Sequence, residues 1–241
     1  MLETTKGIYL HHVPYSDTSV IARIYTEKFG QQTYLVQGIH SRKSGTKINF
    51  FQPLFQLDLE VWYKVGRNLQ RVKSIKLSNP STATSFDLLK NSQAFFISEI
   101  LMKILKEEEP NPELFNYLSN AISFLEVEKD GIANFLIVFL FRLTQYFGIY
   151  PQLPDKKKYR LFDMESGYFT NVEPINHAFM DEETTKLFTI LFHTKISDVG
   201  ALNFKNKHRS ILFEKLIDYY RIHLEMSGEI KSYKILKEII V

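Results

Sequence analysis

The 241-residue sequence contains no cysteine. Disulfide bonds, thiolate catalysis and cysteine-ligated zinc are therefore excluded, and the absence fits a reducing compartment. The first residues also lack a basic stretch followed by an apolar core, so no signal peptide is expected. We therefore expect a cytoplasmic protein.

Long hydrophobic runs are absent as well. The most apolar stretch, residues 132–143, contains Asn134 and is interrupted by Arg142. A membrane-spanning helix needs about 20 apolar residues, so this stretch predicts a buried core helix and no membrane partner.

The sequence has no recognisable catalytic motif. Its seven histidines are scattered, and neither a glycine-rich phosphate loop nor a His-Glu-x-x-His pattern is present. The pair His11-His12 falls on a predicted strand, where one ring faces each side, so a shared metal site is not expected. We predict a protein that is not an enzyme and has no cofactor.

Charge is unevenly distributed along the chain. The net charge is +3, but residues 1–80 hold 11 Lys and Arg against 5 Asp and Glu, whereas residues 81–241 hold 19 against 22. Such asymmetry is expected when one part of a chain meets a polyanion and another does not; a chance fluctuation is the alternative.

The first 80 residues show the two-residue period of half-buried strands. One parity holds Ile8, Leu10 and His12, and another holds Val20, Ala22, Ile24 and Thr26. Further strands are predicted over 33–36, 55–65 and 69–77, with turns at 14–17, 29–30, 38–49 and 65–68. Five short strands predict a barrel of the OB type over residues 1–80, although an SH3-like barrel would give a similar pattern.

From residue 81 the period becomes helical, and the overall fold class is α+β. Helices are predicted over about 86–104, from Asn111-Pro112-Glu113 onward, over 132–147, and over 181–193, 208–226 and 232–240. Residues 151–174 are irregular and predict a small hairpin inserted into this helical domain, 81–241.

The loop over residues 38–49 is the first candidate DNA-binding segment. It holds Arg42, Lys43 and Lys47 among glycine and serine residues. Unburied cations of this kind neutralise phosphates. An ordinary solvated loop would have the same composition.

The last two predicted strands supply a second candidate segment. They mix aromatic rings with cations: Trp62, Tyr63, Lys64, Arg67, Arg71 and Lys73. A sheet face of this composition binds single strands by stacking bases and following the backbone. Strand parity places Trp62 and Tyr63 on opposite faces, so at most one of them faces nucleic acid. Tyr25 and Tyr34 are weaker stacking candidates that fit core packing better.

The C-terminal half carries apolar residues at helical spacings beside cations. The apolar set is Leu187, Phe188, Ile190, Leu191, Phe192, Leu212, Phe213, Leu216 and Tyr220; the cations are Arg209, Lys215 and Arg221. A groove of this kind would suit an acidic peptide that ends in an aromatic residue. Ordinary helix packing explains the same pattern and is the better explanation.

Several segments, taken in order, resemble the RecO family of bacterial recombination mediators. They are Lys6-Gly7-Ile8-Tyr9-Leu10, Pro14 to Ser19, Ile24 to Gly30, Tyr34 to Gly38, Ser41-Arg42-Lys43 and Gln52-Pro53-Leu54, followed more loosely by Ser232 to Glu238. The resemblance implies an N-terminal OB domain and a helical C-terminal domain. It also implies binding to single- and double-stranded DNA, annealing of complementary strands, and contact with the acidic C-terminal tail of single-strand-binding protein (SSB). Joint action with RecR, which helps RecA displace SSB, is implied as well.

Carried onto this chain, the family's basic OB-domain loop falls on Arg42, Lys43 and Lys47. Many family members have four zinc-binding cysteines after the central helices, whereas residues 159–171 have none here. Zinc is therefore not expected, and apolar packing should hold the hairpin instead. A protein-bridging OB-fold adaptor with weak DNA affinity is the alternative function.

Overall fold

The computed structural model describes residues 1–39, 48–79, 87–105, 109–153, 159–175, 177–226 and 228–240. The chain forms two compact units, residues 1–126 and residues 127–241. The first contains a β-barrel, a short 3₁₀ helix and two α-helices, and the second contains the remaining helices and a small sheet.

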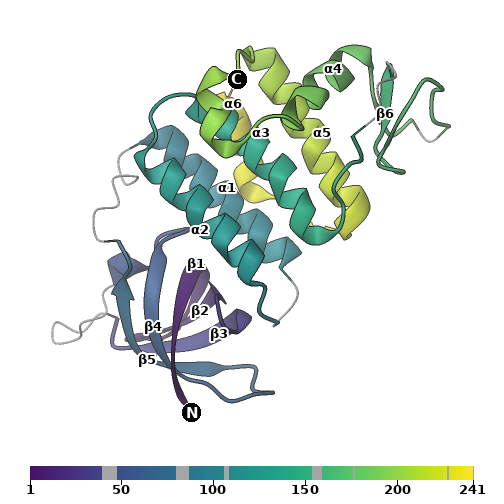
Figure 1. The fold of residues 1–241 in the computed structure, drawn as a ribbon. Coiled ribbons are helices and arrows are strands. Elements are labelled where there is room, and N and C mark those ends of the chain that lie inside the picture. The colour runs from purple at the N-terminus through teal and green to yellow at the C-terminus, as the bar shows by residue number, and fades with distance from the viewer. Residues whose placement is uncertain are drawn as a thin grey trace. The chain divides into compact units, whose positions relative to one another are not determined.

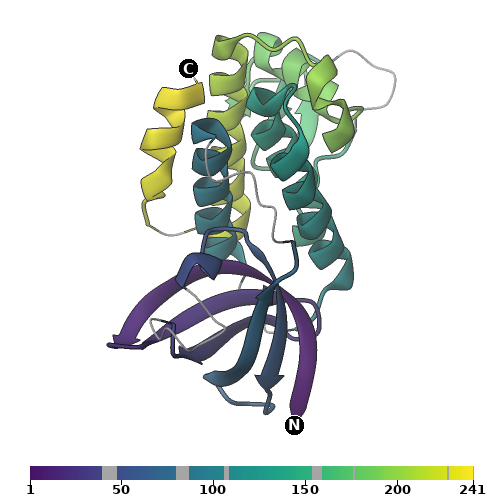
Figure 2. The same cartoon turned by 90° about the vertical axis from the view of Figure 1, so that its left-hand side faces the viewer.

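Five strands close into a barrel in the first unit (Figures 1 and 2). They are β1 (Leu2–Ser16), β2 (Ser19–Thr26), β3 (Gly30–Gln37), β4 (Gln56–Trp62) and β5 (Gln70–Leu77), in the spatial order β1-β2-β3-β5-β4. All neighbours are antiparallel except β3 and β5, which pair in parallel at Tyr34 with Gln70 and Leu35 with Arg71. The five-stranded barrel predicted from the sequence is confirmed.

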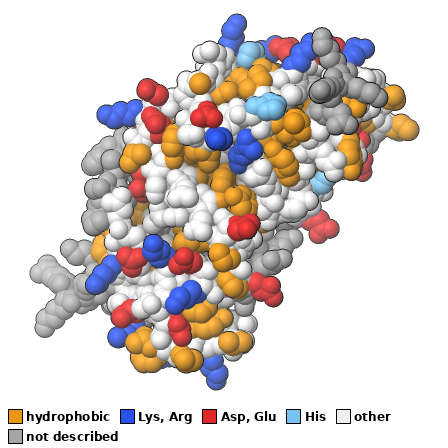
Figure 3. Space-filling view, viewed as in Figure 1, with side chains coloured by type: hydrophobic (Ala, Val, Ile, Leu, Met, Phe, Trp, Pro, Cys, Tyr) orange, Lys and Arg blue, Asp and Glu red, His pale blue; other side chains and the backbone are white. Residues whose placement is uncertain are grey.

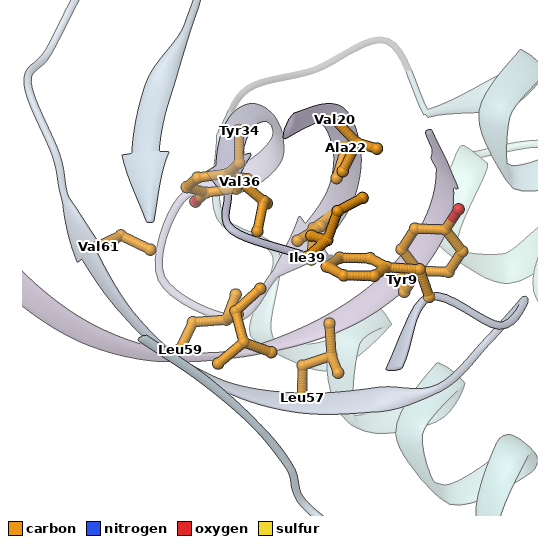
Figure 4. Packing of buried hydrophobic residues seen from close by; sticks show 12 residues of the cluster. Tyr9, Val20, Ala22, Tyr34, Val36, Ile39, Leu57, Leu59 and Val61 are labelled. Carbon is orange, nitrogen blue, oxygen red and sulfur yellow. The ribbon is translucent and has the colours of Figure 1, made fainter. Parts of the chain in front are cut away.

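The barrel interior is filled by alternating residues of the five strands. Val20, Ala22 and Ile24 of β2 face inward, as their shared parity predicts, and meet Leu57 and Leu59 of β4. Val20, Ala22, Leu57 and Leu59 point toward one another in Figure 4. The short helix η1 (Ile48–Phe50) packs against this core. The buried apolar area fixes the strand register, because a one-residue slip would turn every inward side chain outward.

Two helices belong to the same unit as the barrel. They are α1 (Leu88–Ile104) and α2 (Pro112–Val127). The Asn111 side chain accepts a hydrogen bond from the backbone N–H of Leu114 at 2.9 Å, the N-cap that the sequence predicts.

The two helices cover part of the barrel's outer wall. The Ser98 hydroxyl of α1 donates to the carbonyl oxygen of Leu10 at 2.5 Å. The ring of Tyr25 lies 6.0 Å from the ring of Phe115 of α2, centroid to centroid. Tyr25 and Leu10 are consequently buried although they point away from the barrel core. The domain boundary predicted at residue 80 stays a prediction.

The second unit is built around a helix in which ten of twelve residues are buried. Its elements are α3 (Ile132–Leu143), η3 (Thr144–Phe147), β6 (Leu161–Asp163), β7 (Tyr168–Thr170), β8 (Phe179–Met180), α4 (Glu182–Leu191), η4 (Ile196–Ala201), α5 (Asn206–Leu224) and α6 (Lys231–Ile240). The helical run that starts at α3 ends at Gly148, which adopts φ 67°. Among the described residues, no helix has the length and apolar character needed to span a bilayer.

The predicted hairpin is present as β6 and β7, and β8 adds a third strand beside β6. Its anchor is Phe162, which is fully buried and whose ring lies 5.0 Å from that of Phe169 and 4.8 Å from that of Phe188. The Asp163 carboxylate closes the turn by accepting from the Ser166 hydroxyl at 2.7 Å. Aromatic packing and a polar turn together hold this small sheet.

Candidate nucleic-acid interface

Residues 40–47 of the basic loop lie outside the described residues, so Arg42, Lys43 and Lys47 stay a prediction. Both ends of the loop are anchored in the barrel. Ile39 and Phe51 are 4% exposed and belong to the barrel core. The loop is therefore attached to a rigid base at each end.

Trp62 and Tyr63 face opposite sides of the sheet. Trp62, the last residue of β4, is 53% exposed on the outer wall. Tyr63 packs against the barrel core, and its ring stacks on that of Phe29 with the centroids 3.9 Å apart. One face of the Tyr63 ring is thus already covered, which leaves Trp62 as the better placed ring for a nucleobase.

Arg71 of β5 lies directly opposite Trp62 of β4 in the antiparallel ladder. Side chains at paired positions project from the same face with Cβ atoms about 5 Å apart. Arg71 is exposed, and no described carboxylate forms an ion pair with it. A ring and an available guanidinium therefore stand side by side.

Arg67 lies in the β4–β5 turn, which the buried amide of Gln70 holds in place. The Gln70 side chain donates to the carbonyl oxygens of Lys64 and Arg67, both at 2.9 Å, and accepts from the Lys64 N–H at 3.0 Å. Gln70 is 1% exposed, whereas Arg67 and Lys64 are exposed. Sequence reasoning missed Gln70, because nothing in its local pattern distinguishes it from a solvated strand end.

Lys73, by contrast, has an acidic neighbour. Its ammonium group lies 3.5 Å from the Glu60 carboxylate. The Ser74 hydroxyl donates to the same carboxylate at 2.9 Å, and this bond, followed by the charge of Lys73, lowers the pKa of Glu60 below its usual range. Glu60 therefore stays ionised and offsets the charge that Lys73 would offer to a phosphate.

The outer wall of β1 and β4 is electrically balanced in the same way. Lys6 of β1 and Lys76 of β5 flank Asp58 of β4 in register. Figure 3 shows cationic and acidic side chains interleaved over the barrel at the lower end of the view. Of the predicted set, Trp62, Arg67 and Arg71 are the members best placed for a polyanion.

Two family models divide the chain between them. The Recombination protein O N-terminal model matches residues 1–81, and the Recombination protein O C-terminal model matches residues 85–234. The chain belongs to the RecO family.

Proteins named DNA repair protein RecO are similar over nearly the full length. The protein from Phocaeicola vulgatus is 35% identical over 239 residues, 99% of each chain. Those from Bacteroides fragilis and Flavobacterium psychrophilum are each 34% identical, over 241 residues (99% of each chain) and 236 residues (98% of each chain). The resemblance to the RecO family identified from the sequence is confirmed, and the chain is a DNA repair protein of that family.

The remaining aromatic candidates in this RecO-family barrel are unavailable to a ligand. Tyr34 lies in the barrel core and is 0% exposed, and Tyr25 is covered by α2. Burial raises the pKa of Tyr34 far above its ordinary value. Both rings pack internally, as the sequence analysis favoured.

Most of the apolar residues of the hypothetical groove are buried in the helical unit. Phe188, Leu191, Leu212, Phe213, Leu216 and Tyr220 are at most 1% exposed. Two of the flanking cations also have structural partners: Lys215 donates to the carbonyl oxygen of Phe179 at 2.9 Å, and Arg221 lies 3.3 Å from Asp218. These residues pack α4 against α5, the ordinary helix packing that the sequence favours.

Proposed function

We propose that this chain binds single- and double-stranded DNA through phosphate contacts on the outer wall of its barrel and anneals complementary strands. In this proposal it acts with RecR to assist RecA on DNA coated by SSB, and it engages the SSB C-terminal tail. It acts in the cytoplasm, associated with the nucleoid. It makes or breaks no covalent bond and requires no zinc or other cofactor.

The observation that carries the proposal is the pairing of Trp62 with Arg71 on adjacent strands. An exposed indole gives a nucleobase a flat surface, and the neighbouring guanidinium gives the attached phosphate a partner. Arg67 extends the cationic surface at the turn that Gln70 holds. Because stacking and phosphate contacts ignore base identity, the interface should bind strands of any sequence.

Annealing follows from the same contacts. Two complementary strands repel each other through their phosphates, and cations that neutralise these charges lower the cost of bringing the strands together. No step of this process needs nucleotide hydrolysis. The family membership and the basic N-terminal segment both support this role.

Replacing Trp62 with Ala should weaken binding to a labelled oligothymidine by about 1–3 kcal/mol, roughly 5- to 150-fold in Kd. The reason is the loss of one base-stacking surface. Fluorescence anisotropy in 50 mM salt measures the change. Trp62→Phe should retain most of the affinity, because a ring remains.

Tyr168→Ala is a matched control, since Tyr168 is 52% exposed on β7 of the other unit. It should leave the affinity unchanged. Equal losses in Trp62→Ala and Tyr168→Ala would mean that the indole is not a contact. A chain that ignores oligonucleotides yet binds an SSB tail peptide would instead be the bridging adaptor.

The salt dependence of DNA binding tests whether the predicted basic loop contacts phosphates. Each phosphate contact with a single strand adds about 0.7 to the slope of log affinity against log salt, so five contacts give a slope near −3.5. Changing Arg42, Lys43 and Lys47 together to Ala should reduce the steepness by about 2. Titrations between 50 and 300 mM salt measure both slopes. An unchanged slope would place the phosphates elsewhere.

A further inference from the structure

Most carboxylates of the barrel segment lie together on one part of its wall, whereas Asp17 lies in the turn between β1 and β2. Residues 1–80 contain Glu3, Asp17, Glu27, Asp58 and Glu60. A shallow depression lined by β1, β4, β5 and the β2–β3 turn gathers three of them, Glu27, Asp58 and Glu60, with three lysines, Lys6, Lys28 and Lys76. Glu3 lies 3.8 Å from Lys28. Because the acidic and basic side chains on this side of the wall offset one another, a polyanion gains little by binding there.

Strands β2 and β3 are different, because neither contains Asp or Glu. The single cation on them is Arg23, in the middle of β2. Its neighbours Ala22 and Ile24 point into the barrel core, so Arg23 points outward, and it is exposed. No described carboxylate forms an ion pair with it. In the ladders it lies opposite His11 of β1 and Thr33 of β3.

An apolar row connects the surroundings of Arg23 to the Trp62–Arg71 pair. Ile21 of β2 is paired with Leu35 of β3, and Leu35 is paired with Arg71 of β5. Both apolar side chains are partly exposed. Arg71 is in turn paired with Trp62. Four neighbouring strands thus present one continuous outward row with no acidic member.

Sheet geometry sets the spacing of the two guanidinium groups. Arg23 and Arg71 are separated by two inter-strand steps of about 4.8 Å and by two residues of about 3.4 Å along the strands, or on the order of 12 Å between Cα atoms. Long arginine side chains can reach different phosphates of one strand over this span. The apolar side chains between them suit the faces of bases, which single strands expose and duplexes hide.

We propose that a single strand of nucleic acid crosses the barrel wall transversely, from Trp62 and Arg71 over Leu35 to Arg23, and that Arg23 is a second phosphate contact. This inference rests on the proposed DNA binding and specifies the path. The strand avoids the part of the wall around Asp58 and Glu60, where lysines offset the carboxylates, and follows the row that lacks carboxylates.

Three single substitutions test the path in the full-length protein: Arg23→Gln, Arg71→Gln and Lys76→Gln. Lys76 is exposed on β5 opposite Asp58. Lys76→Gln therefore removes one positive charge, as Arg23→Gln does, but from a region where a carboxylate already offsets it. Anisotropy titrations with a labelled oligothymidine should show affinity about five-fold weaker at 0.1 M salt for Arg23→Gln, with the slope less steep by about 0.7. Lys76→Gln should leave the slope unchanged. Circular dichroism checks that each variant is folded.

The outcomes separate the path from the proposed function. A loss in Arg71→Gln with no loss in Arg23→Gln would overturn the transverse path and leave DNA binding at the β4–β5 end intact. Equal losses of affinity in Arg23→Gln and Lys76→Gln would show that only the net charge of the protein matters, and would also overturn the path. If the unaltered protein fails to bind the oligonucleotide, the proposed function itself is wrong.

Discussion

Substituting Gly131 with Ala should destabilise the unit of residues 127–241 by about 3–5 kcal/mol. Gly131 is the N-cap of α3 and adopts φ 68°, a conformation that costs an alanine energy. A Cβ atom there would also lie 2.5 Å from the backbone N and Cα of Gly200 in η4. Neither atom can move aside without displacing η4 as a whole, so the two costs add.

The contact between α3 and η4 also depends on Asn134. Its side-chain amide, 5% exposed, donates to the carbonyl oxygens of Val199 at 3.0 Å and Leu202 at 2.9 Å. A shift of η4 away from an alanine at position 131 would stretch both bonds and leave a buried amide unsatisfied. The overpacking cost is therefore difficult to relieve.

Gly200→Ala is the matched control for this prediction. A Cβ at position 200 would lie 3.6 Å from the Cβ of Asp130, an ordinary contact, and Gly200 does not have a positive φ. We expect its midpoint in urea unfolding to stay close to that of the unaltered chain, whereas the Gly131→Ala midpoint falls. Similar midpoints for the two variants would show that η4 can shift at little energetic cost. They would refute the claim that the close approach of Gly131 to Gly200 excludes a Cβ atom.

Local signals in the sequence predicted most of the individual elements. The alternation over 20–26 predicts an inward face that the barrel core contains. Asn111 before Pro112 predicts the start of α2, and Gly148 predicts the end of the helical run after α3. Each of these signals acts within a few residues, so one sequence is enough to recognise it.

Contacts between distant segments were not predictable in the same way. Nothing near Gly131 indicates that Gly200 will lie against it, and nothing near Tyr25 indicates that α2 will cover its ring. The turn predicted at 14–17 also lies further along, because β1 continues to Ser16. These features depend on how separate elements pack, and alternation or capping carries no information on that.

In the candidate interface, too, local sequence patterns predict some features, whereas contacts between distant segments determine others. Strand parity correctly separates Trp62 from Tyr63, since it is a local property. It cannot reveal that Glu60 offsets Lys73, because that pairing depends on the register of β4 against β5. Arg23 becomes a candidate only when the parallel pairing of β3 with β5 brings its row beside Arg71.

A fragment of residues 1–80 should fail to fold, whereas a fragment that continues to Val127, the end of α2, should fold cooperatively. Ile8, Leu10 and Tyr25 point away from the barrel core and yet are at most 3% exposed. Uncovering a large apolar side chain costs about 1.5–3 kcal/mol, so three cost roughly 5–9 kcal/mol. That approaches the whole stability of a typical domain, about 5–15 kcal/mol.

Cooperative urea unfolding and the dispersion of amide proton resonances distinguish the two fragments. In the longer fragment, Phe115→Ala removes the ring that contacts Tyr25 and should lower the free energy of unfolding by about 3–5 kcal/mol. Glu113→Ala, two residues earlier on an exposed position of α2, is the control and should change it by less than about 1 kcal/mol. A well-dispersed spectrum from residues 1–80 alone would show that the barrel needs no helical cover. The α1–α2 pair would then be a separate module that merely rests on the barrel.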